Sequence, residues 1–163
     1  MADSEIFVSA DEAGAAIRVL GKGSFSCSRE IAAYGLEMVR RQVPRVIIDL
    51  AACTGMDSTF MGVLAQIASQ GRVGGCMLAI ANANQERREQ LEELGVHRIV
   101  SFIDRDLSGL SWRVLEPADT SRLAQARTVL EAHEMLTEID AANITRFKDV
   151  VEFIRKDIEN LSE

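Results

Sequence analysis

The sequence predicts an α/β fold: a mixed, largely parallel sheet covered by helices, with a C-terminal helical hairpin extension. Three observations support this class. Residues 46–50 and 76–81 are short and nearly continuous apolar runs, which are typical of strands buried on both faces. Segments with apolar residues at helical spacing alternate with these runs. The chain from residue 117 onward shows helical patterns.

The first expected strand covers residues 17–20 and ends where Gly21 and Gly23 permit a turn. Residues 28–41 carry apolar side chains at helical spacing, and Pro44 ends that segment. The expected strand at 46–50 follows. Because it is apolar almost throughout, we expect it near the centre of the sheet.

The second expected helix, which follows the strand at 46–50, has a broad apolar stripe and is expected to stop at Gly71. A strand at 76–81, a charged surface helix at 85–94 and a short strand at 99–102 complete the alternation, with Gly95 closing the surface helix. Strands that alternate with helices imply right-handed crossovers between parallel strands.

The expected domain boundary separates an α/β domain at residues 1–116 from a C-terminal helical extension at 117–163. Asp119 or Thr120 can cap the first helix of this extension, and Asn143 can cap the second. The second helix carries a short heptad seam, which favours packing inside the protomer and leaves self-association or partner binding open. Its members are Ile144, Phe147, Val151, Ile154, Ile158 and Leu161.

The composition indicates one soluble, cytoplasmic domain. A chain of 163 residues with 47% hydrophobic content can bury a single sizeable core. Its 18 basic and 25 acidic side chains give a net charge of -7, which opposes nonspecific binding to nucleic acid or to an anionic membrane. The acidic start predicts no secretory signal, and no run reaches the roughly 18 apolar residues that a membrane span requires.

Cysteines and histidines indicate neither a metal site nor a cofactor. The three cysteines Cys27, Cys53 and Cys76 lack a paired motif, so we expect reduced thiols rather than disulfides or a zinc site. The two histidines, His97 and His133, are far apart in sequence and are expected to be ordinary side chains. No residue is predicted to be catalytic.

The segment 55–62, Gly-Met-Asp-Ser-Thr-Phe-Met-Gly, places polar side chains between a strand and a helix. These residues can cap the helix, or they can offer Ser58 to another protein for modification. With Asp57 as the cap, Ser58 would lie at the positive end of the helix dipole. A phosphate there adds about -1.5 to -2 charges and would repel a partner that packs on Phe60 and Met61.

Residues 46–50 followed by 56–64 resemble the signature of the STAS domain, the family of bacterial anti-sigma-factor antagonists. From about residue 17 to residue 102, the order of the expected strands and helices also matches that of the family. The expected domain at 1–116 is therefore STAS-like. The resemblance implies phosphorylation at Ser58, with Thr59 as a second candidate. It implies partner contacts at Asp57, Thr59, Phe60 and Met61. The implied partners are an anti-sigma factor that is also a serine kinase of the GHKL ATPase type, and a serine phosphatase. Such a protein would regulate transcription in bacteria without being an enzyme.

Two departures from the family pattern keep other functions open. The usual Gly-Leu-Gly is replaced by Phe60, Met61 and Gly62, and the loop at 23–26 lacks the acidic residue that often helps the kinase engage. The first departure concerns which partner is bound. The missing acidic residue and the heptad seam of the extension favour a non-phosphorylated STAS scaffold or oligomer subunit in a signalling or transporter complex. A small-molecule sensor or an enzyme is a third class, suggested only by the closeness of Cys53 to Ser58 in sequence.

Overall fold

The computed structural model describes residues 4–116 and 121–162. In this part of the chain, one seven-stranded sheet has the order β6-β5-β3-β2-β1-β7, and β4 pairs with β2 beside this path. The strands are β1 (Ser4–Asp11), β2 (Gly14–Gly23), β3 (Arg45–Asp49), β4 (Cys53–Met56), β5 (Met77–Ala81), β6 (Ser101–Ile103) and β7 (Arg113–Val114). The helices are α1 (Phe25–Arg40), α2 (Ser58–Gly74), α3 (Gln85–Glu93), the short η1 (Val96–Arg98), α4 (Arg122–Ile139) and α5 (Ala142–Ser162).

The sheet is mixed and largely parallel, which confirms the predicted class. β2, β3, β5 and β6 pair in parallel, whereas β1 pairs antiparallel with both β2 and β7. The register places Ile17 opposite Ile48 and Ile48 opposite Ile80. All three isoleucines are buried in the main core, so the apolar runs of the sequence form its centre.

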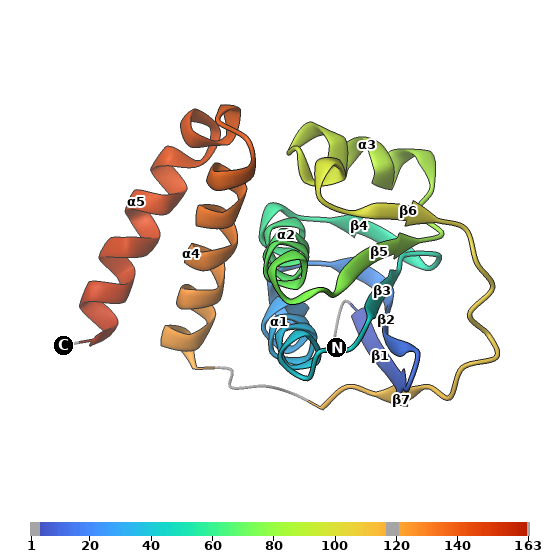
Figure 1. Cartoon of the computed structure of the whole chain (residues 1–163). Helices are drawn as coiled ribbons and strands as arrows, with labels where there is room; N and C mark the ends of the chain where they lie inside the picture. The colour runs from blue at the N-terminus through green and yellow to red at the C-terminus, as the bar shows by residue number, and fades with distance from the viewer. Residues whose placement is uncertain (1–3, 117–120, 163) are drawn as a thin grey trace.

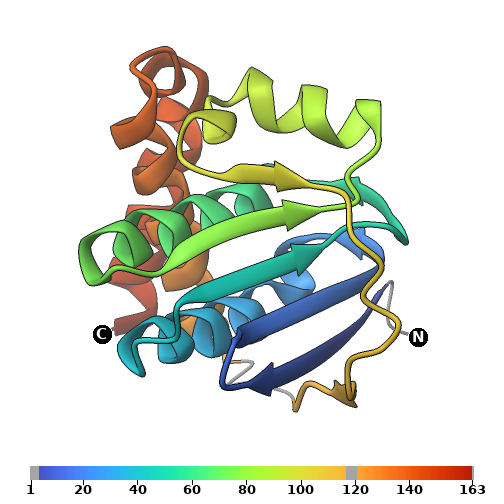
Figure 2. The same ribbon diagram turned by 45° about the vertical axis from the view of Figure 1, so that its right-hand side comes forward.

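One face of the sheet carries the helical layer (Figure 1), in which α2 lies beside α1 and is crossed on its outer side by α4. This position explains why α2 is buried on most sides. The opposite face is lined by small residues such as Ala16 and Ala79, which pack with Leu107. In Figure 2 the segment after β6 passes from one edge of the sheet to β7 at the other edge. Its Trp112 ring lies 4.1 Å from the Arg18 guanidinium.

The C-terminal hairpin predicted from the sequence is confirmed as α4 and α5. α5 packs against α4 within the chain. Of the seam residues, Phe147 is buried, Val151, Ile154, Ile158 and Leu161 are half-buried, and Ile144 is exposed. The predicted caps are not those observed. Ser121 caps α4, while Asp119 and Thr120 lie outside the described residues. Asn143 lies inside α5 and is buried, so its prediction as a cap is wrong.

The predicted stop of the second helix at Gly71 is also wrong. α2 continues to Gly74, and the residue that ends it is Gly75, with φ 80° in the left-handed region. At Gly71 the reason for glycine is space, because a Cβ there would lie 2.7 Å from the carbonyl oxygen of Cys76. This glycine therefore allows the chain to approach the helix closely, without ending it.

Candidate functional site

Asp57 joins the first turns of two helices. It lies between β4 and α2, and one carboxylate oxygen accepts a hydrogen bond from the N–H of Phe60 at 2.9 Å. The other oxygen accepts from the N–H of Phe25, the first residue of α1, at 2.8 Å. The first N–H groups of a helix have no partner within the helix, and the helix dipole favours a negative charge there. One side chain therefore caps α2, as expected, and also binds α1.

Ser58 is the first residue of α2, and it is half-buried. Its Oγ lies 2.9 Å from Nε2 of His133, a residue of α4 that is 75 positions away in sequence. The other ring nitrogen, Nδ1, lies 2.7 Å from the carbonyl oxygen of Val129. A carbonyl only accepts, so Nδ1 carries a proton; in the neutral ring Nε2 then accepts from the Ser58 hydroxyl.

His133 is held in place from several sides. Only 3% of it is exposed. Besides its hydrogen bonds, its ring meets the ring of Phe147 edge-on, with centroids 4.9 Å apart and planes at 75°. The serine that resembles the family's phosphorylation site is thus hydrogen-bonded to a buried side chain of the C-terminal hairpin.

The crossing of α2 and α4 is close because Gly62 lies at the contact. A Cβ at this position would overlap the carbonyl oxygen of Ala132, so any larger residue would force the helices apart. One turn further along α2, Gln66 donates to Glu131 at 3.4 Å. Figure 1 looks nearly along α2 and shows α4 running across it. Contacts with α4 therefore extend from Ser58 to Gln66.

The predicted contact surface at Phe60 and Met61 is wrong. Both side chains belong to the hydrophobic core, and Phe60 is 0% exposed. The Phe60 ring packs under β2 so closely that a Cβ at Gly23 would lie 2.9 Å from it. Thr59, the second phosphorylation candidate, is buried as well. Thr59, Phe60 and Met61 belong to the broad set of buried residues of α2.

Phe25 supplies an exposed aromatic side chain beside the site. It is 56% exposed, and its N–H is bound by Asp57. In the sequence its loop stands out only for lacking an acidic residue. No local pattern marks Phe25 as exposed, because it lies three positions before Ser28 and seven before Ala32, which are both buried in α1.

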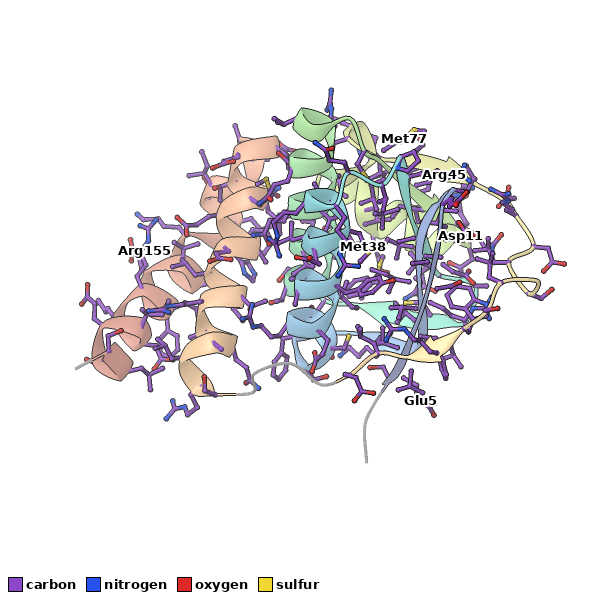
Figure 3. The ribbon with its side chains drawn as sticks, turned by 60° about the horizontal axis from the view of Figure 1, so that its bottom comes forward. Glu5, Asp11, Met38, Arg45, Met77 and Arg155 are labelled. Carbon is purple, nitrogen blue, oxygen red and sulfur yellow. The ribbon has the colours of Figure 1, made fainter. Side chains whose placement is uncertain are left out.

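Other features lie away from Ser58. A cavity of about 150 Å³ lies where β1, β2 and β3 meet residues 105–110. In Figure 3, Asp11 and Arg45, which line it, lie on the far side of the sheet from Arg155 of the hairpin. Among residues 4–116 and 121–162, no three His, Cys, Asp or Glu side chains are grouped so that they could hold a metal ion. No helix in these ranges has the length and apolar character needed to cross a membrane.

Comparison with known proteins identifies the family. The family model described as "Mlab, STAS domain" matches residues 6–101. A Thermotoga maritima protein assigned as an anti-sigma factor antagonist has a similar crystal structure, with TM-score 0.51, 16% identity, and coverage of 64% of this chain and 88% of that one. The anti-sigma factor antagonist SpoIIAA in its unphosphorylated form is similar too, with TM-score 0.50, 15% identity, and coverage of 61% and 84%. The search of curated proteins returned no match. Since the matched range exceeds half of the chain, the protein belongs to the STAS domain family.

Proposed function

We propose that this protein is a protein-interaction switch of the anti-sigma-factor-antagonist type, controlled by reversible phosphorylation of Ser58. The observation that carries the proposal is the position of Ser58: it is the first residue of α2 and directly follows Asp57, which binds the first turns of α1 and α2. Asp57 thus links the two helix ends, and the exposed Phe25 is the first residue of α1 there. The chain itself catalyses nothing in this scheme.

The switch works through charge at the contact surface. A phosphate on Ser58 adds about -1.5 to -2 charges. The helix terminus tolerates this charge because free N–H groups and the positive end of the dipole lie beside it. A partner that packs on Phe25 would have to bury the hydrated phosphate next to the carboxylate of Asp57, which is costly without a compensating cation. Binding is lost while the sheet and its helices keep their structure.

The partners follow from the family and from the chemistry of a serine phosphate. We propose an anti-sigma factor that is also a serine kinase of the GHKL ATPase type, and a serine phosphatase that removes the mark. This places the protein in the bacterial cytoplasm, in the control of transcription. In this proposal Phe25 takes the contact role first predicted for Phe60 and Met61.

Two substitutions test the switch against an anti-sigma kinase of the GHKL type, the proposed partner. We expect Ser58→Ala to bind that kinase at least as tightly as the natural chain and to gain no phosphate in the presence of ATP. Ser58→Asp should bind at least about tenfold more weakly, which corresponds to about 1.4 kcal/mol. Calorimetric titration gives the affinities, and intact-protein mass spectrometry detects the phosphate.

A pair of phenylalanine substitutions tests the proposed contact surface. Phe25→Ala should weaken binding, whereas Phe153→Ala, which alters an exposed phenylalanine of α5, should not. Equal affinities of Ser58→Asp and Ser58→Ala would exclude the charge switch.

A second candidate is a non-phosphorylated scaffold or oligomer subunit in a signalling or transporter complex. Two observations favour it: the Ser58 hydroxyl is bound by the buried His133, and the matched family model carries the description "Mlab, STAS domain". Under this alternative the natural chain keeps its unmodified mass in the presence of the anti-sigma kinase and ATP, under conditions in which a control substrate is phosphorylated. It would also bind a membrane ATPase in place of a soluble kinase.

A further inference from the structure

The C-terminal hairpin occupies the same end of α2 that the proposed switch uses. His133 binds Ser58, the backbone of Ala132 lies against Gly62, and Glu131 accepts from Gln66. The helix that covers Ser58 is therefore part of the same chain. Residues 6–101, which match the family model, do not include it.

A kinase needs better access to the Ser58 hydroxyl than the closed structure gives. In the reaction, Oγ attacks the γ-phosphorus of ATP, the bond from that phosphorus to ADP breaks, and the hydroxyl proton passes to a base on the kinase. The attacking oxygen and the leaving oxygen must lie in line. In this structure the hydroxyl hydrogen bond is directed at Nε2 of His133 at 2.9 Å, and α4 lies over this side of α2.

We propose that the α4–α5 hairpin is a built-in cover for Ser58, and that α4 must leave α2 before a macromolecule can modify this residue. The cover is held closed by the hydrogen bond between Ser58 and His133, together with the close contact of Ala132 with Gly62 and the hydrogen bond from Gln66 to Glu131. Once the phosphate is present, its oxygens cannot fit into the 2.9 Å between Oγ and Nε2, so phosphorylation and closure oppose each other. By linkage, phosphorylation then favours the open hairpin to the same extent that closure disfavours phosphorylation.

The link between this cover and phosphorylation rests on the proposed function, but the test of the cover requires neither a kinase nor a partner. Ser58→Cys places a thiol where the hydroxyl was. The natural cysteines Cys27, Cys53 and Cys76 are all buried. Burial also raises the pKa of the Cys27 and Cys76 thiols, which lowers their content of reactive thiolate.

The probe is a maleimide attached to a large polyethylene glycol chain, which reports access by a macromolecule. Gln70→Cys, on an exposed position of α2, is the reference for an open site. We expect the thiol of the Ser58→Cys variant to react at least about tenfold more slowly than that of the Gln70→Cys variant, because reaction at position 58 requires local opening of the hairpin.

Gly62→Ala, combined with Ser58→Cys, opens the cover while keeping His133. Its Cβ would overlap the backbone oxygen of Ala132, and that oxygen cannot turn aside as a side chain could. Gly74→Ala is the matched control, since its Cβ meets only a methyl group of Val39 at 3.9 Å. We expect Gly62→Ala to speed labelling at position 58 by at least about tenfold and Gly74→Ala to leave it unchanged.

Hydrogen exchange shows whether the variant is folded and where it has opened. Faster exchange in α4 and α5, with unchanged exchange in the sheet, is the expected pattern. The cover is excluded if the Ser58→Cys variant, with no other change, is labelled as fast as the Gln70→Cys variant. It is also excluded if Gly62→Ala loosens α4 without speeding labelling, or changes neither quantity. If no kinase modifies Ser58, the phosphorylation switch is refuted but the cover is not. If the Ser58→Cys variant is labelled rapidly, the cover is refuted but the phosphorylation switch is not.

Discussion

The sheet with its helices and the C-terminal hairpin share one core, but they differ in how far they depend on apolar burial. In the sheet, Ile17, Ile48 and Ile80 pack in register and are fully buried, and Phe60 is buried beside them. In α5 the buried residues are Asn143 and Phe147, while Phe153 is 69% exposed. Burial of apolar area is strong and non-directional, whereas the hairpin also depends on particular contacts at Ser58, Gly62 and Asn143. The hairpin can therefore loosen while the sheet stays folded.

The largest expected effect comes from removing the core aromatic. Phe60→Ala should lower the free energy of unfolding of the whole chain by about 3–5 kcal/mol, because it loses buried area and leaves a cavity under β2. Phe153→Ala removes the same atoms from an exposed position and should stay within about 0.5 kcal/mol. Urea denaturation measures both. Similar losses in the two variants would contradict the distinction between the two parts.

Asn143→Ala should act mainly on the hairpin. The side-chain amide donates to the carbonyl oxygens of Leu94 and Leu136, at 2.9 and 2.8 Å, and thereby ties α5 to α4 and to the end of α3. Leaving these buried oxygens without donors costs about 1–3 kcal/mol. Hydrogen exchange should increase in α4 and α5 before it increases in the sheet. The neighbouring Ile144→Ala, at an exposed position, is the control, and equal exchange in both variants would refute this role.

Asp57 should show the smallest of the three effects. Asp57→Ala removes acceptors for the N–H groups of Phe60 and Phe25, and the loss of a cap typically costs about 0.5–2 kcal/mol. Asp57→Asn keeps one acceptor oxygen but turns an NH₂ group toward the second N–H, so we expect an intermediate loss. Chemical denaturation ranks the variants. An asparagine variant as unstable as the alanine variant would show that the two bonds do not act separately.

The clearest strand predictions concern strands buried on both faces. Residues 46–50 and 76–81 correspond to β3 and β5, since a continuous apolar run is a strong signal. β1 was not predicted, although Ile6 and Val8 alternate with more exposed residues along it. β4 has only four residues, including a glycine, and it forms because it pairs with β2. Short strands of this kind depend on their neighbours in space.

The candidate site also contains residues that could be predicted from local sequence and one residue that could not. Asp57 and Ser58 could be placed from the sequence because a cap and the first residue of a helix depend on a few adjacent positions. His133 could not be linked to Ser58, since 75 residues separate them and its spacing fitted an ordinary helical stripe. Only the docking of α4 on α2 brings the two together.

By itself, the sequence determined the α/β class, the main strands and helices, the terminal hairpin and the position of Ser58 at a helix start. These features follow from periodicity and capping, which act over a few residues. The tertiary structure alone decided that Phe60 is buried, that Phe25 is exposed, and that His133 meets Ser58. These outcomes depend on which surfaces pack together across long separations in the chain, and a local pattern carries no information about that choice.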